Sequence, residues 1–526
     1  MTATVQSSTT TTTTSSSPVV RKSGGITTRH TVVRAWASRT PKWQRFQPVR
    51  IQPNESTTTS VESKQKEVFA YQRQYSHVYH HRLMALRDRC WKQLAVNDGT
   101  KTNNNNSSSS TTNLDDSNPV TAVRVNRILE LKEDQLSRVV GTLVKETINP
   151  DEEVLHPKAT CRPSDQLYLE DESGRVILSL DGTGVAAHQV YQFCTGVVIG
   201  VEGMVDDKGV LHVQHLATPA PLPPPTALAV HNTAGLLEPS QPEGYEPHLL
   251  LVSSLECGDP QVSSLPRELL VGYLQGQFTD AASKVARVIV AGSGPSATDP
   301  LGGLKELDMF AGIQVSGGRN GGVGMQIPLD ILPSSKDPTT ANWPQRPLHS
   351  SLLPLSNKDN QRMVMSTPNP YEAIHGTKSV MGTDGLNVRD LQKHILKPNP
   401  NDKDDVPVPL TELEALEQTI RWAHLCPTGP DHLGMVPSND PMDMGKTTPH
   451  IYFCGNCEEG FATKLLGYKN EEDGDDDDDV KSKTRLVCIP KFSETGEAVL
   501  VNLRTLDVEL IRFKVEEEEE EENSNL

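Results

Sequence analysis

Residues 248–256 read HLLLVSSLE, an apolar run that ends in small polar residues and one carboxylate. A second run at 285–291, VARVIVA, is followed by Gly292 and Ser293. Strands that are apolar at nearly every position, and not only at every second one, are typical of sheets covered on both faces. Helical patterns at 266–277 and 301–312 alternate with these strands. The sequence therefore predicts an α/β fold in which any functional site lies at the strand ends.

The alternation continues toward the C-terminus. We expect a strand at 326–332, a helix at 411–423 and a strand at 450–454. A terminal pair of strands is expected at 485–489 and 498–503, continued by 508–513. These elements define one large domain over 226–515, interrupted by an acidic insert at about 468–483.

The segment before this domain has the signals of a small β-barrel. Five expected strands occupy 137–146, 166–170, 175–180, 196–205 and 210–215, and a short helix at 186–194 follows the third. This order is typical of an OB barrel, which we place at 119–225 and which ends in the proline-rich run 219–225. Tyr168 is the one aromatic residue of these strands, which favours a structural barrel over one that binds single-stranded nucleic acid.

Polar segments surround the folded parts. Apolar residues at helical spacing predict a helical segment at 66–96, with basic residues such as Arg82 and Arg87 on its other side. A disordered N-terminus at 1–65, a linker at 97–118 and an acidic tail at 516–526 complete the predicted organisation of the 526 residues. The Ser/Thr-rich N-terminus, with several Arg and no acid before Glu55, also has the composition of an organelle transit peptide.

The formal net charge of -18 comes mostly from two runs of acidic residues, at 471–479 and 516–522. The rest of the chain is nearly balanced and lacks the basic excess of a dedicated DNA-binding protein. Eight scattered cysteines suit a reducing compartment. No apolar run approaches the ~20 residues of a membrane-spanning helix.

The residues at the strand ends resemble the metal-binding motifs of calcineurin-like phosphoesterases, but most ligands are replaced. In that family the motifs are Asp-x-His, Gly-Asp, Gly-Asn-His-Asp/Glu and Gly-His-x-His, and together they hold two cations. Where the family has these ligands, the sequence has Ser254 and Glu256, Ser293, Ser335 and Lys336, and Asn456 and Glu458, and it keeps Asp337. A lysine opposes cation binding and serine is a poor substitute for a carboxylate. We therefore expect a vestigial phosphoesterase site that holds no metal or other cofactor and catalyses no reaction.

An OB barrel followed by an inactivated phosphoesterase domain resembles the B-subunit family of the eukaryotic replicative DNA polymerases. The stretches most similar to the delta small subunits are FAYQRQYSHVY at 69–79, DQLYLED at 165–171, TPNPY at 367–371, PTGPDHLG at 427–434, PHIYFCGN at 449–456 and LVNLRTL at 500–506. The resemblance implies a nuclear scaffold that binds the cysteine-rich C-terminal metal domain of the catalytic subunit of polymerase delta. It also implies binding to a third subunit, indirect contact with the sliding clamp and DNA, and no membrane association.

Two other functions stay open at this point. One is a residual metal-dependent phosphodiesterase in which Glu256, Asp337 and Glu458 are the ligands. The other is single-stranded DNA binding by the barrel. The pair Cys454 and Cys457 is a weak zinc or redox signal, because the sequence has no second close pair.

Overall fold

A computed structural model describes residues 2–9, 22–23, 74–103, 122–181, 189–225, 246–278, 284–316, 327–356, 364–399, 406–437, 440, 442–444, 448–468 and 482–516. The chain forms two compact units, each built from separate stretches of sequence. The first contains 1–55, 224–386 and 449–526, and the second contains 56–223 and 387–448. The acidic insert and the acidic tail lie almost entirely outside the described residues, as does the part 104–118 of the expected linker. Residues 97–103, which we expect to belong to that linker, continue the helix instead.

The first unit contains two β-sheets. The larger has the order β12-β11-β10-β9-β20-β21-β1-β2. Its strands are β1 (Thr2–Thr9), β2 (Lys22–Ser23), β9 (His248–Val252), β10 (Val285–Ala291), β11 (Leu329–Leu332), β12 (Val364–Ser366), β20 (Glu497–Asn502) and β21 (Val508–Glu516). Strands β9 to β12 are parallel, so their carboxyl ends meet at one edge of the sheet.

The smaller sheet has the order β13-β14-β17-β19-β18. Its strands are β13 (Tyr371–His375), β14 (Lys378–Thr383), β17 (Ile451–Cys457), β18 (Ala462–Tyr468) and β19 (Ser482–Pro490). Side chains of both sheets share one apolar core, in which Leu249 and Ile289 meet Ile451, Phe453 and Val487. The two sheets therefore pack face to face as a sandwich.

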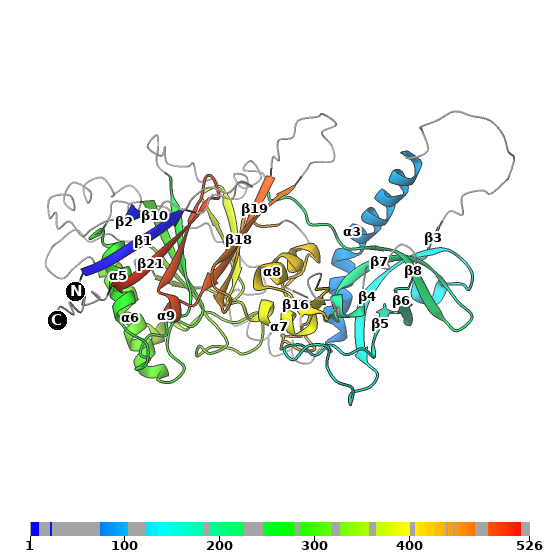
Figure 1. Cartoon of the computed structure of the whole chain (residues 1–526), viewed down its shortest axis with the longest axis horizontal. Helices are drawn as coiled ribbons and strands as arrows, with labels where there is room; N and C mark the ends of the chain where they lie inside the picture. Colours follow the sequence, from blue (N-terminus) through cyan, green and yellow to red (C-terminus); the bar gives the residue numbers. More distant parts are fainter. Residues whose placement is uncertain are drawn as a thin grey trace, which may run out of the picture. The chain divides into compact units, whose positions relative to one another are not determined.

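Helices cover the other face of the larger sheet. α5 (Leu265–Leu274) and α6 (Pro300–Ser316) pack on it in Figure 1, and the short α9 (Phe492–Thr495) connects β19 to β20. Tyr273 of α5 and Leu307 of α6 join Leu250 and Val288 of the sheet in a second core. Alternate residues of β9 and β10 thus enter opposite cores, which explains why both strands are apolar at nearly every position.

The second unit is built on a closed barrel. Its sheet contains β3 (Val123–Arg124), β4 (Ser137–Thr147), β5 (Asp165–Glu170), β6 (Arg175–Ser179), β8 (Val210–Ala217) and β7 (Val198–Val205), and β4 pairs with β7 to close it. α3 (Ser76–Asn103) packs against β7. A Cβ on Gly200 of β7 would lie 2.7 Å from Leu94 Cδ1, so glycine at this position permits the close approach.

The remaining elements of the second unit come from the region after the barrel in sequence. They are α7 (Leu386–His394, which begins at the unit boundary), β15 (Leu396–Lys397), β16 (Val408–Pro409) and α8 (Glu412–Arg421). Single 3₁₀ turns occur at Ile128–Glu130, Val190–Gln192 and Ser350–Leu352. No helix among the described residues is both long and apolar enough to cross a membrane.

The architecture confirms the predicted OB barrel and α/β sandwich. The expected pairing of the strands at 485–489 and 498–503 is wrong, because β19 lies in the smaller sheet and β20 in the larger. α9 and Gly496, with φ at +64°, carry the chain from one sheet to the other. The expected helix at 186–194 is a 3₁₀ turn over Val190–Gln192 in its described part.

Two expectations for the N-terminal part also need correction. β1 and β2 lie within the segment 1–65 that we expect to be disordered, and β1 pairs with β21. Thr- and Val-containing sequence has strand propensity, and β21 would otherwise expose an open edge. Arg82, which we expect on the basic side of the helix opposite its apolar residues, has a fully buried side chain.

Candidate functional site

The strand ends of the first unit turn sharply. Ser254, Glu256, Ser293 and Asn456 have φ values of +54°, +46°, +52° and +53°. A left-handed backbone costs a residue with a Cβ about 1–2 kcal/mol, so such turns persist only where surrounding contacts hold them. The described chain has seven such non-glycine residues, and four of them are positions that the sequence assigns to the phosphoesterase-like motifs.

Hydrogen bonds join the ends of β9 and β10. The backbone N–H of Ser254 donates to the carbonyl of Gly292 at 3.1 Å, and that of Glu256 donates to the carbonyl of Ser293 at 3.2 Å. Ser254 Oγ donates to Glu256 Oε1 at 3.2 Å. The side chains of Ser254 and Glu256, which stand at the first motif, are thus hydrogen-bonded to each other.

Asp337 is a buried acidic residue of the site. Its Oδ2 accepts hydrogen bonds from the backbone N–H groups of Ser293, at 3.1 Å, and Ser334, at 2.6 Å. Burial raises the pKa of Asp337 to about 7, against the opposing effect of these hydrogen bonds and with a further contribution from the Asp384 carboxylate. The carboxyl group therefore holds two loop ends together and is partly protonated at neutral pH.

Three of the predicted site residues, Ser335, Lys336 and Glu458, are exposed and lie outside the buried cluster around Asp337. Ser335 and Lys336 are exposed, and the buried hydroxyl next to Ser293 is that of Ser334, with the two Oγ atoms 3.2 Å apart. The side chain of Glu458 is 67% exposed and lies 3.4 Å from the ammonium of Lys491. The assignment of the eight residues as a vestigial site stays a prediction.

The structure adds residues that the sequence reasoning missed. Asp384 follows β14 and is fully buried, as is Asn369. Asn369 Nδ2 donates to Asp384 Oδ1 at 2.8 Å, and Asn456 Nδ2 donates to the Asp384 carbonyl at 2.9 Å. The sequence did offer a signal for Asp384. It is a carboxylate directly after a short apolar strand that ends in Gly382-Thr383.

Gly292 lies at the centre of this cluster, with φ at +85°. A Cβ at this position would lie 2.8 Å from Asp384 Cβ, 2.9 Å from Asn456 Nδ2 and 3.1 Å from Ser334 Cβ. The side chains of three other strand ends thus pack directly against the backbone of Gly292. A glycine is required there by both conformation and space.

The donor set does not fit the two cations that the resemblance to the phosphoesterases implies. A pair of metals needs several carboxylate or imidazole ligands, including one between the two ions. The motif positions offer hydroxyls at Ser254 and Ser293, and the two buried carboxylates each use one oxygen as a hydrogen-bond acceptor. Asp337 Oδ1 and Asn369 Oδ1 are buried without a hydrogen-bond partner, but these two atoms do not supply a two-metal centre.

The barrel of the second unit has a groove of about 620 Å³. Its described lining includes Asp165 and Asp181 and contains no lysine, arginine or aromatic residue. Tyr168 already stacks under Arg175, whose Cζ lies 4.8 Å from the ring centroid. Single-stranded DNA sites combine cations with free aromatic faces, so this groove does not favour that function.

Comparisons with known proteins agree with this architecture. Residues 74–216 match the family model described as DNA polymerase delta subunit OB-fold domain, and residues 249–463 match the model for the B subunits of DNA polymerases alpha and epsilon. The DNA polymerase delta small subunit of Oryza sativa is 30% identical over 74% of this chain and 86% of its own length. The corresponding Saccharomyces cerevisiae protein is 26% identical over 85% and 90%.

A Drosophila melanogaster protein named DNA polymerase delta subunit 2 is 29% identical over 68% of this chain and 75% of its own length. The matches thus span both units, including the barrel and the strand-end motifs. The chain belongs to the family of DNA polymerase delta small subunits.

Proposed function

We propose that this chain is a non-catalytic accessory subunit of DNA polymerase delta that serves as a scaffold in replication and repair synthesis. One hydrogen bond supports a non-catalytic role most directly. The backbone N–H of Ser293 donates to Asp337, and Ser293 stands where the phosphoesterase family has a metal-binding aspartate. The buried carboxyl group of Asp337 thus connects two loops. The domain then acts by binding other molecules with its surface.

The proposed partners follow from family membership. The first is the catalytic subunit of polymerase delta, bound through its cysteine-rich C-terminal domain, and the second is a third subunit that contacts the sliding clamp. DNA is then reached only through the assembly, in agreement with a barrel groove that carries aspartates. The proposed location is the nucleus, where replication takes place.

The test is recovery of the catalytic subunit from nuclear extract on the tagged full-length chain, with the untagged chain as control. A stable interface of the size of obligate subunit contacts is largely apolar, so the complex is expected to survive a wash at high salt. Mass spectrometry identifies the recovered protein. Failure to recover the catalytic subunit at any salt concentration contradicts the proposal.

A further inference from the structure

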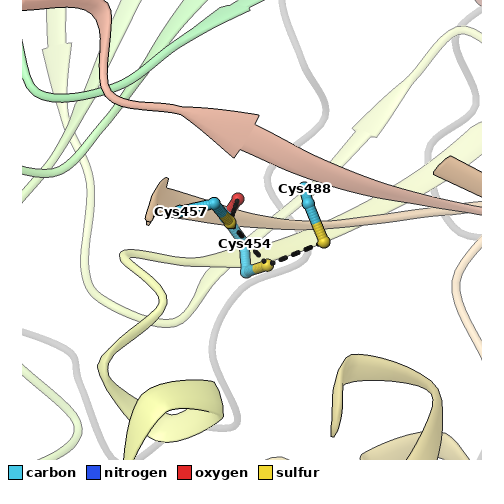
Figure 2. Close-up of side chains that lie close together, drawn as sticks. All are labelled: Cys454, Cys457 and Cys488. Atoms are coloured by element: carbon cyan, nitrogen blue, oxygen red, sulfur yellow. Dashed lines mark hydrogen bonds between the residues drawn. The ribbon is translucent and has the colours of Figure 1, made fainter. Parts of the chain in front are cut away.

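Three cysteines of the first unit converge at the centre of the smaller sheet. Cys454 Sγ lies 3.4 Å from Cys457 Sγ and 3.7 Å from Cys488 Sγ. All three sulfurs lie within 4.8 Å of one another, and the residues are 0%, 3% and 0% exposed. Figure 2 shows the sulfur of Cys454 between the other two. Among the described residues this is the one group of metal-ligating side chains with such spacing.

The fold explains the convergence. Cys454 of β17 and Cys488 of β19 are cross-strand neighbours in register, and both alternate with core residues such as Phe453 and Val487. Their side chains therefore lie on the face of the sheet opposite that core.

The third cysteine reaches the same place through an irregularity in its strand. Simple alternation would point Cys457 to the opposite face from Cys454, because the two residues are three positions apart. The left-handed turn at Asn456 and the register shift between Cys454 and Cys457 break this alternation. The turn that shapes the vestigial phosphoesterase site thus also completes the group of thiols.

We propose that Cys454, Cys457 and Cys488 bind a single Zn²⁺ ion as thiolates. Sulfurs on a tetrahedral zinc with Zn–S bonds of about 2.3 Å are roughly 3.8 Å apart. The separations of 3.4 and 3.7 Å from Cys454 Sγ are close to that value and far from the ~2.05 Å of a disulfide. Soft thiolate ligands select zinc or Cu⁺ over the hard cations Mg²⁺ and Ca²⁺.

Between Zn²⁺ and Cu⁺, the charge of the resulting complex favours Zn²⁺. Zinc binds cysteine as the thiolate, so each of the three ligands gives up its proton when the ion binds. Binding releases three protons to solvent and forms a Zn(SR)₃ group with a net charge of -1, whereas Cu⁺ would leave -2. The smaller buried charge costs less free energy. The described residues supply no fourth cysteine, histidine or carboxylate in the group.

Zinc would cross-link β17 to β19 and fix the turn at Asn456. The inference concerns the first unit alone and does not depend on the proposed function. It differs from the two-metal site of the phosphoesterases, because all three ligands are sulfurs and lie on β17 and β19.

The test is the metal content of the full-length chain, expressed with added zinc salt and purified over a weak chelator. Elemental mass spectrometry is expected to find about one zinc per chain. Cys457→Ser and Cys488→Ser are expected to lose most of it. Cys257→Ser, which alters a buried free cysteine of the same unit outside the group, is expected to keep it. Replacement by Co²⁺ is expected to give thiolate-to-cobalt charge-transfer absorption in the wild type and in Cys257→Ser, and not in Cys457→Ser or Cys488→Ser.

Zinc-free wild-type protein that keeps its fold overturns the proposal, as does zinc that persists in both Cys457→Ser and Cys488→Ser. A mass lower by two hydrogens under non-reducing conditions, without metal, shows a disulfide and also overturns it. If the serine variants do not fold, X-ray absorption of the wild-type protein decides the matter. Three sulfur neighbours around zinc support the proposal, and a shell of nitrogen and oxygen alone contradicts it.

Discussion

Arg82 of α3 donates a hydrogen bond from Nε to Oδ2 of Asp440 at 2.7 Å, and both side chains are buried. The other guanidinium nitrogens donate to the carbonyls of Gly196, Pro427 and Gly429 at 2.7 to 3.0 Å. His424 Nε2 lies 2.8 Å from the same Asp440 oxygen. Burial alone raises the pKa of Asp440, but His424 and Arg82 hold it well below its ordinary value. One arginine thus connects the helix, the barrel and the 427–440 region of the second unit.

Replacing this arginine is expected to destabilise the second unit strongly. Arg82→Met leaves the Asp440 carboxylate buried without its guanidinium and three carbonyls without their donor. Removal of one partner of a buried ion pair costs about 3–5 kcal/mol. Urea unfolding monitored by tryptophan fluorescence measures the change in the free energy of unfolding.

The matched control is Arg421→Ala in α8, in the same unit. Its side chain is 61% exposed and pairs with Glu417 one helical turn away. Such pairs contribute less than about 0.5 kcal/mol. Equal losses of the free energy of unfolding in Arg82→Met and Arg421→Ala would show that the network around Arg82 stabilises the unit no more than a surface ion pair does.

Asp337→Asn is expected to gain stability relative to wild type as the pH rises from about 4 to about 7. The pKa of Asp337 is raised to about 7 in the folded chain, against ~3.9 when unfolded. The stabilisation from the protonated carboxyl is complete below pH ~3.9 and is lost as the pH rises through about 7, at roughly 1.4 kcal/mol per unit. Asparagine keeps the acceptor for Ser293 and Ser334 and does not titrate.

Unfolding titrations of both proteins from pH 4 to 8 provide the measurement. Repetition with Mn²⁺ is the control, since a cation at Asp337 would lower its pKa and stabilise the wild type alone. A pH-independent difference between the two proteins contradicts the assignment of Asp337 as a buried, cation-free carboxyl group.

His450→Asn is expected to reduce the acid sensitivity of the first unit. His450 Nδ1 accepts hydrogen bonds from the N–H and hydroxyl of Ser379, and burial followed by Lys378 lowers its pKa to about 4. Below pH ~6.5 the unfolded chain takes up a proton that folded His450 does not, so stability is lost as the pH falls from ~6.5 toward 4. Asn Oδ1 can accept the same bonds without titrating.

The difference in the free energy of unfolding between wild type and His450→Asn is therefore expected to narrow by about 1–2 kcal/mol between pH 7.5 and 5. His349→Asn is the control, because this histidine is exposed and lies in the same unit. A difference that widens toward acid pH would mean that folded His450 is protonated.

Gly292→Ala is expected to destabilise the first unit more than Gly460→Ala. Both glycines have positive φ, +85° and +91°, so alanine strains the backbone at each by about 1–2 kcal/mol. A Cβ at Gly292 also overlaps Asp384 and Asn456, whereas a Cβ at Gly460 meets nothing within 4 Å. Overpacking adds about 1–3 kcal/mol. Thermal unfolding measures the difference, and equal losses would mean that the strand ends are loosely packed.

The local patterns predicted much of the fold. The run 285–291 coincides with β10, and the polar residues that follow the apolar strands mark the turns found at Ser254, Ser293 and Asn456. Such features depend on neighbouring residues and on alternation, which a sequence displays directly.

Features that depend on distant residues could not be read in this way. The network of Arg82 joins residues up to 358 positions apart, and nothing in helical spacing distinguishes this arginine from an exposed one. The segment 387–448, which we expect to belong to the 226–515 domain, packs into the second unit. Cys488 completes the thiol group only because β19 pairs in register with β17.

The most direct test of the central proposal, that the phosphoesterase-like strand ends hold no two-metal catalytic site, is hydrolysis of bis(p-nitrophenyl) phosphate with added Mn²⁺. Wild type, Asp337→Asn and heat-denatured chain are compared at the same concentration. The account predicts the same background rate in all three samples. Mn²⁺-dependent turnover by the wild type that disappears in Asp337→Asn would contradict it.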